Sequence, residues 1–434
     1  MATFSERQAR HRRWRERGLL AIICASMLLL SACRVVALPK QQTTTSTTEP
    51  PRTSVVLSQT GWPSQQTSAP EETSAPDTTS WTAAIQPLPA VHELAARIIP
   101  SFEKRYLLVH LDEERLTTFC TLYQAAMAFE PTAELPEPVT VGELFDLMLL
   151  LNYTCPELMQ ISGEYYYSYD DTGRCTDVTF TYLMNADEYD DALQQVEAQF
   201  DEWKHRLAGR SDLEKERFVY EWIIQAATYQ DTATYAGSCY GVIVDRKARC
   251  EGYAKTFMWA MWELDIPCIS ITGESTDPGN SIYSRHVWNL VQVNGIWAYV
   301  DTTFDDFNEF YPISYSFLNV DENSIADSRS IDPVYLELNL PPCTSMENSF
   351  HEQAGVYYRG DANPIEVIGD AIEHADAEGS NRVYLKVETA ELFQTIRDSL
   401  SDLLTQWLTE RGVPWSYTWY SYPDGRAFVI DFAD

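Results

Sequence analysis

The stretch Ser284–Thr303, SRHVWNLVQVNGIWAYVDTT, decides the fold of the central part of the chain. Two runs of alternating apolar and polar residues flank the dipeptide Asn294-Gly295. Asn-Gly between such runs is the strongest short signal for a β-hairpin with a two-residue turn. The turn also sets the register, because it predicts that Val293 pairs with Ile296. We therefore expect an antiparallel pair of strands here.

This register places a histidine and an aspartate together. His286 and Asp301 would lie on the same face of the hairpin, one diagonal step apart, at about 7 to 8 Å between backbones and within reach of a side-chain hydrogen bond. A slip of one residue would put them on opposite faces, so the register tests the interpretation. Such a carboxylate would orient the imidazole and stabilise its protonated form.

A cysteine precedes the hairpin at the predicted start of a helix. Cys250 opens a segment with apolar residues at helical spacing, which Asp265-Ile266-Pro267 ends. The free amides at a helix start are expected to favour the thiolate, the nucleophile of acyl transfer, and to lower its pKa. Each residue alone is more typical of a structural role. Together, Cys250, His286 and Asp301 predict a catalytic triad.

The residues around this triad resemble the transglutaminase-like core of the papain-like cysteine enzyme superfamily. In that superfamily a cysteine at a helix start is followed by a histidine in the next strand and an aspartate in the one after. The resemblance covers about 100 residues and includes these segments: Gly252-Tyr253-Ala254, Ile266-Pro267-Cys268, His286–Asn289 and Val300–Asp306. It implies an α+β fold, in which the cysteine helix packs on an antiparallel sheet and smaller α/β modules flank this core.

The resemblance also implies a reaction. The Cys250 thiolate would attack a protein or cell-wall peptide amide, and His286 would protonate the leaving amine. An amine would then resolve the thioester by cross-linking, or water would resolve it as in a peptidase or amidase; the sequence leaves both open. The superfamily adds a side-chain donor to the oxyanion hole, for which Tyr229 is our candidate and Tyr240 a rival. Trp288 is expected to shield the triad.

Two functions of other classes compete with this interpretation. One is a non-catalytic surface module that binds peptide or mediates adhesion on the same fold. The other is a structural domain in which Cys250 is bonded in a disulfide. Beyond the first 33 residues the chain has seven cysteines, an odd number, which leaves at least one thiol unpaired in a monomer and makes the second alternative the less attractive.

The first 33 residues predict export. Several arginines precede the apolar run Leu19–Leu30, which is too short for a transmembrane helix. The run ends in Leu30-Ser31-Ala32-Cys33, which resembles the lipobox of bacterial lipoproteins and implies lipidation of Cys33. The alternative is an ordinary signal peptide. We expect a lipid-anchored protein on the extracytoplasmic face of a bacterial membrane, of the kind found among Firmicutes surface proteins.

Composition divides the rest of the chain. Residues 34–88 are rich in Thr, Ser and Pro and predict a disordered linker. We expect an N-terminal α/β module over 89–210, the catalytic domain over 211–342 and a C-terminal α/β module over 343–434.

The net charge of −33 argues against binding of nucleic acid. No CxxC motif or His/Cys cluster indicates a metal site, and no cofactor is expected.

Overall fold

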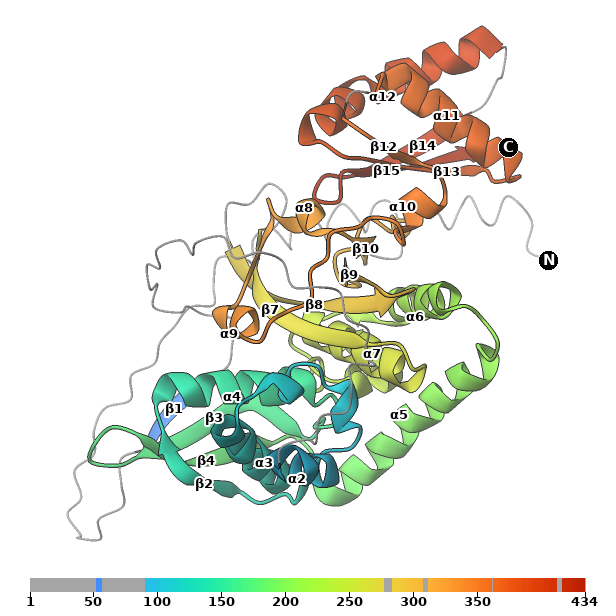
Figure 1. The fold of residues 1–434 in the computed structure, drawn as a ribbon. Coiled ribbons are helices and arrows are strands. Elements are labelled where there is room, and N and C mark those ends of the chain that lie inside the picture. The colour runs from blue at the N-terminus through green and yellow to red at the C-terminus, as the bar shows by residue number, and fades with distance from the viewer. Residues whose placement is uncertain are drawn as a thin grey trace. The chain divides into compact units, whose positions relative to one another are not determined.

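The computed structural model describes residues 52–56, 90–276, 283–306, 311–360, 362–411 and 416–433 (Figure 1). The predicted signal peptide and Cys33 lie outside these ranges. Within them, every helix is too short or too polar to cross a membrane. The architecture is α+β with mainly antiparallel sheets, as the sequence predicts.

The N-terminal module combines helices with a four-stranded sheet of order β1-β3-β4-β2. Its strands are β1 (Arg52–Val56), β2 (Thr132–Val139), β3 (Ile161–Tyr169) and β4 (Cys175–Tyr182). Its helices are α2 (Ala90–Ile98), α3 (Glu113–Met127) and α4 (Val141–Thr154), with 3-10 turns η1 (Phe102–Lys104) and η2 (Leu108–His110). Strand β2 contains two prolines, which an edge position tolerates because one side of the strand needs no partner.

Strand β1 departs from the expectation of an unstructured linker. Arg52–Val56 pairs antiparallel with β3, from Arg52 opposite Ser168 to Val56 opposite Glu164. Two adjacent valines give this segment a β preference that the surrounding Thr/Ser/Pro composition hides. A free edge of β3 supplies the hydrogen-bonding partner. Part of the predicted linker therefore belongs to the folded module.

Helix α5 (Ala186–Arg206) connects this module to the central domain. Asn185 and Glu188 form a capping box at its start, because each side chain accepts a hydrogen bond from the other residue's backbone amide. Helix α6 (Asp212–Ala226) follows and also begins with a capping box, formed by Ser211 and Glu214.

The central domain contains a five-stranded sheet of order β10-β9-β8-β7-β11. Its strands are β7 (Cys268–Thr276), β8 (Tyr283–Val293), β9 (Ile296–Val300), β10 (Leu318–Val320) and β11 (Arg329–Ile331). Helix α7 (Cys250–Glu263) packs against β7 and β8 (Figure 1). Val293 pairs with Ile296, and Asn294 and Gly295 both have positive φ, as a type I′ turn requires. The predicted register is confirmed.

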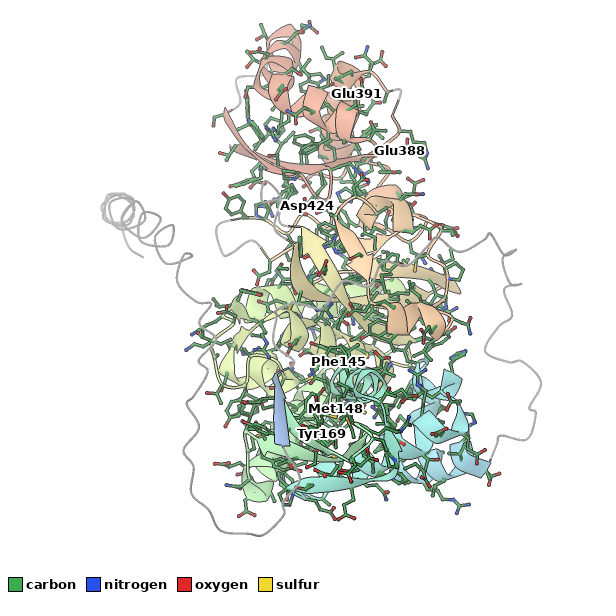
Figure 2. All side chains as sticks on the ribbon, turned by 90° about the vertical axis from the view of Figure 1, so that its left-hand side faces the viewer. Phe145, Met148, Tyr169, Glu388, Glu391 and Asp424 are labelled. Carbon is green, nitrogen blue, oxygen red and sulfur yellow. The ribbon has the colours of Figure 1, made fainter. Side chains whose placement is uncertain are left out.

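One apolar core joins the N-terminal module to the central sheet. Buried residues of α4, such as Leu147 and Leu151, belong to the same core as Ile271 of β7 and Val287 of β8. Figure 2 labels Phe145 and Met148 of α4, which extend this packing toward Tyr169 of β3.

The C-terminal module is α/β, as predicted, and from β12 onward has a β-α-β-α-β-β order. Its elements are β12 (Tyr357–Tyr358), α11 (Pro364–Ala377), β13 (Arg382–Val387), α12 (Ala390–Arg411), β14 (Ser416–Tyr422) and β15 (Ala427–Ala433). Helices α11 and α12 cover one face of the sheet. From the other face, Lys386 Nζ donates to the Ser316 carbonyl at 3.1 Å and Tyr422 to the Pro312 carbonyl at 2.7 Å. The turn that carries Asp424, labelled in Figure 2, packs against Ser316 through Gly425.

Candidate active site

His286 and Asp301 form a buried hydrogen-bonded pair. His286 Nε2 lies 2.7 Å from Asp301 Oδ2, and the two residues expose 5% and 3% of their surface. The hairpin explains the contact: His286 lies on β8, and Asp301 directly follows the last residue of β9. The structure thus brings together the two residues that the Asn-Gly turn predicts as neighbours.

Four hydrogen bonds reach the carboxylate of Asp301. Oδ1 accepts from the backbone amides of Thr303 and Phe304, each at 3.1 Å. Oδ2 accepts from His286 and from Arg329 Nη2, each at 2.7 Å. Burial opposes ionisation, but the charges of His286 and Arg329 and their hydrogen bonds outweigh it and lower the pKa of Asp301 to about 2. Asp301 is therefore an ionised and fully hydrogen-bonded group.

Arg329 is the site residue that the sequence analysis missed. Its guanidinium carbon lies 4.4 Å from the ring centroids of both Phe304 and Phe317, and its side chain is 1% exposed. The three-residue strand Arg329-Ser330-Ile331 matches no motif and lies 28 residues after Asp301. Only the pairing of β11 with β7 brings it to the site, and no sequence signal indicates that pairing.

Cys250 is the first residue of α7, as predicted, but its ionisation differs from the prediction. The residue is 3% exposed. Burial, followed by the negative charge of Glu251, raises the pKa of the thiol to about 12; Asp301 adds to the rise and Arg249 opposes it. The expectation of a lowered thiol pKa is wrong for this structure, because burial outweighs the amides of the helix start.

Residues on both sides of Cys250 connect it to the N-terminal module. Glu251 accepts a hydrogen bond from Tyr153 of α4 at 3.0 Å and pairs with Arg249 at 2.7 Å. A Cβ on Gly237 would lie 2.4 Å from the Glu251 carboxylate, so glycine leaves room for this ion pair. Tyr153 and Glu251 therefore attach α4 to the residues beside the thiol.

Asn289 holds β8 against α7 one turn after Cys250. Its side-chain amide donates to the Ala254 carbonyl at 3.1 Å and to Ser270 Oγ at 2.9 Å. Asn289 is buried, and no described group donates a hydrogen bond to its Oδ1. The contact fixes the strand that carries His286 relative to the helix that begins at Cys250.

Of the two tyrosines considered for the oxyanion hole, Tyr229 lies beside the cysteine. Strand β5 (Thr228–Tyr229) pairs in parallel with β6 (Lys247–Ala248), and Tyr229 is opposite Ala248. Tyr229 exposes 47% of its surface, yet burial of its hydroxyl end, followed by the charge of Cys250, raises the pKa of that hydroxyl. Tyr240 instead packs edge-on against Tyr235, with ring centroids 5.2 Å apart.

Trp288 packs against the histidine. The two rings are nearly parallel, with centroids 5.8 Å apart, and Trp288 is almost fully buried. The Phe304 ring also meets the histidine edge-on, with centroids 4.7 Å apart. Two aromatic rings therefore contact the imidazole.

The seven cysteines of the body, Cys250 among them, are free and buried. The alternative of a disulfide-bonded Cys250 is therefore wrong. Within the described residues no group of three His, Cys, Asp or Glu side chains is arranged to hold a metal ion.

Comparison with known proteins matches this region to one family. The sequence model of the family described as Transglutaminase-like superfamily matches residues 201–302. Kyphoscoliosis peptidase of Mus musculus is 25% identical over 178 residues, which are 35% of this chain and 26% of that protein. The Homo sapiens kyphoscoliosis peptidase is 24% identical over 176 residues, with the same coverage. The chain thus spans about a quarter of the length of these relatives.

Two solved structures share weaker similarity. One is a TGase, with a TM-score of 0.24 and 14% identity over 42% of this chain and 52% of that chain. The other, from Cytophaga hutchinsonii, is described as a candidate cysteine protease, with a TM-score of 0.22 and 15% identity over 32% of this chain and 61% of that chain. At these TM-scores neither structure carries an argument. The family match stands on the sequence: residues 201–302 of this chain form a transglutaminase-like core domain.

Proposed function

We propose that this chain is a cysteine acyltransferase or hydrolase that forms a thioester between Cys250 and the acyl group of a protein or peptide amide. The observation that carries the proposal is the buried His286–Asp301 hydrogen bond beside a helix that begins at Cys250. The negative charge of Asp301 acts on the Cys250 thiol, because it helps to raise the pKa of that thiol. A nucleophile, a base and a residue that orients the base are the groups that covalent acyl transfer requires.

The hydrogen bond to Asp301 supports a proposed proton path. Because His286 donates through Nε2 to an ionised carboxylate, the lone pair of the neutral ring lies on Nδ1. A thiol with a pKa of about 12 is neutral near pH 7. In the proposed attack, Sγ bonds to the amide carbonyl carbon while the thiol proton passes to Nδ1. The resulting imidazolium then gives this proton to the leaving amine, which departs and leaves the thioester.

The second half of the reaction releases the acyl group. Water or a substrate amine gives a proton to Nδ1 and attacks the thioester carbon, and the proton then returns to the departing sulfur. Water yields a carboxylic acid, whereas an amine yields a new amide and thus a cross-link. The relatives named as a peptidase are in keeping with the hydrolytic outcome. Tyr229 and the backbone amide of Cys250 are the proposed donors to the oxyanion.

The proposed location is the extracytoplasmic face of a bacterial membrane, with Cys33 lipidated. Three features support it: the arginines near the N-terminus, the apolar run Leu19–Leu30 and the sequence Leu30-Ser31-Ala32-Cys33. Proteins and cell-wall peptides are the substrates that this location would offer. The membrane contact would be made through the lipid.

A non-catalytic peptide-binding module is the second candidate. Two observations favour it: the triad residues are at most 5% exposed, and the Cys250 thiol has a raised pKa. In that case Cys250 would be a buried structural thiol, and the fold would bind peptide without turnover.

The decisive experiment compares wild type with Cys250→Ala. Each is incubated with a dansylated amine and a glutamine-bearing protein, and both amine incorporation and peptide cleavage are followed by mass spectrometry. Incorporation that depends on Cys250 identifies a transferase, and cleavage alone identifies a hydrolase. Peptide binding without either product supports the non-catalytic module.

Cys120→Ala is the matched control. It also removes a buried thiol, but from α3 of the N-terminal module. Equal activity in Cys120→Ala and wild type, with none in Cys250→Ala, assigns the reaction to Cys250. Activity that survives in Cys250→Ala would refute the proposal.

A further inference from the structure

We propose that Arg329 is a positioning residue that keeps Asp301 ionised and keeps the basic nitrogen of His286 at Nδ1 throughout the reaction. The inference rests on the proposed function, because it concerns the same site. Arg329 would touch neither substrate nor nucleophile and would act through Asp301.

The sheet delivers Arg329 to the carboxylate. Strand β11 pairs antiparallel with β7, with Arg329 opposite Ser275 and Ile331 opposite Gly273. Gly273 in turn pairs with His286 on the other side of β7. The glycine allows this approach, because a Cβ there would lie 1.8 Å from the Ser330 carbonyl oxygen. Arg329 therefore reaches the His286–Asp301 pair from the strand beyond β7.

Aromatic rings hold the guanidinium in place. Its central carbon lies 4.4 Å from the centroids of Phe304 and Phe317 and 5.9 Å from that of Trp288. Ring faces attract a cation, and the attraction is stronger where water is excluded, as at this 1% exposed side chain. Nη1 also donates to Ser328 Oγ at 3.2 Å. The orientation of the side chain is thus set before any substrate binds.

The two cations on Asp301 Oδ2 differ in one respect. The imidazole gains and loses its charge during the proposed reaction, whereas a guanidinium does not titrate in proteins. With His286 neutral and Arg329 absent, Asp301 would be a buried carboxylate without a counter-ion, which burial drives toward protonation. A protonated Asp301 could donate to Nε2, which would move the ring proton to Nδ1 and leave no base facing the thiol. Arg329 prevents this exchange.

The test is the pH profile of kcat/KM in Arg329→Met, Arg329→Gln and Arg329→Lys. An opposite charge within about 4 to 6 Å lowers the pKa of an aspartate by about 1 to 3 units. Met and Gln should therefore shift the acidic limb of the profile upward by about one pH unit or more, while Lys restores most of the wild-type profile. Gln retains a hydrogen-bond donor, so it separates the charge from the hydrogen bond. An acidic limb that stays in place in both neutral variants overturns the inference.

Arg105→Met is the matched control for the loss of a buried arginine. Arg105 lies in the N-terminal module, is equally enclosed and pairs with Glu157 at 2.7 Å. The Arg105→Met variant should have a lowered melting temperature, as Arg329→Met does, but the acidic limb of its pH profile should not move. If Arg105→Met moves the limb by the same amount, the shift reflects lost stability and the inference fails.

A second readout does not depend on turnover. The NMR signal of the Nε2–H proton of His286 is followed in protein labelled with nitrogen-15 at histidine. As the pH falls, this signal should disappear at a higher pH in the neutral variants than in wild type, because its acceptor, Asp301, becomes protonated at a higher pH. If wild type has no Cys250-dependent activity but this signal shifts, the proposed function fails while the Arg329–Asp301 coupling stands. If wild type is active and the signal is the same in all variants, only this inference fails.

Discussion

Gly273 of β7 and Ser330 of β11 approach so closely that a Cβ at position 273 would lie 1.8 Å from the Ser330 carbonyl oxygen and 2.8 Å from the Trp288 ring. The contact joins the last strand of the sheet to the strand beside His286. It therefore links packing of the sheet edge to the geometry of the proposed triad.

Gly273→Ala should destabilise the protein by about 1 to 3 kcal/mol, the usual cost of forcing an extra group into a packed interior. It should also lower activity by more than the loss of stability explains, because β11 carries Arg329. Thermal unfolding and the rate of Cys250-dependent product formation measure the two effects. Gly142→Ala in α4 is the control, since its Cβ would meet only the Thr140 hydroxyl at 4.0 Å.

Asp301→Asn should reduce kcat by about 10⁴-fold if the aspartate sets the tautomer of His286. The amide cannot serve as an ionised acceptor, so the ring proton is no longer held at Nε2. Steady-state kinetics with a peptide amide provide the measurement. Asp431→Asn breaks an Arg382 ion pair in the C-terminal module and should leave kcat unchanged; equal losses in both variants would argue against a role for Asp301 in the reaction.

Tyr229→Phe should lower kcat by about 10² to 10³-fold with little change in KM, since an oxyanion donor acts on the transition state. Tyr240→Phe should have no such effect, because the Tyr240 ring packs edge-on against Tyr235. Comparable losses in the two variants, or a loss confined to Tyr240→Phe, would remove Tyr229 from the oxyanion hole.

Alkylation of Cys250 should be slow near neutral pH and should rise about tenfold per pH unit without a plateau below about pH 10. This follows from the raised pKa of about 12, which burial and the charge of Glu251 produce. Glu251→Gln removes the negative charge, lowers the thiol pKa and should accelerate alkylation at pH 8. Peptide mapping after iodoacetamide treatment measures the rates. A plateau near neutral pH would instead indicate a resting thiolate paired with imidazolium.

Glu216 should make stability fall as pH rises. It is buried in α6, accepts from Asn319 at 2.6 Å, and burial raises its pKa from 4.5 to about 8. The folded state therefore binds one more proton than the unfolded state between these values, so this contribution is present below pH 4.5 and is lost through pH 8. The slope is at most about 1.4 kcal/mol per pH unit.

Glu216→Gln keeps an acceptor for Asn319 without the ionisation. The variant should lose this part of the pH dependence and should be more stable than wild type at pH 8. Denaturant unfolding at pH 5, 6.5 and 8 measures the difference. Parallel pH dependences in the two proteins would show that Glu216 does not ionise over this range.

Local signals predicted much of the fold. The Asn294-Gly295 turn set the register of β8 and β9, and Pro267 followed the end of α7. Each of these signals acts within a few residues of the element that it determines. For the same reason the His286–Asp301 contact could be predicted, since one hairpin carries both residues.

Features that depend on packing could not be predicted in this way. Arg329 reaches Asp301 through a three-residue strand whose partner is β7, a pairing without a local signal. The pKa of Cys250 depends on burial by the N-terminal module as well as on the helix start, and the sequence shows only the latter. Strand β1 forms because β3 has an edge to which Arg52–Val56 can pair.

Strand β1 also shortens the linker between the folded body and the proposed membrane anchor. If Cys33 carries the lipid, the 18 residues 34–51 separate it from β1, the first strand in the described part of the chain. Fully extended, such a chain spans at most about 3.3 to 3.6 Å per residue, or roughly 60 Å in total. A linker running to residue 88 would span about three times that distance. The folded body would therefore work on targets close to the bilayer rather than deep within a thick cell wall.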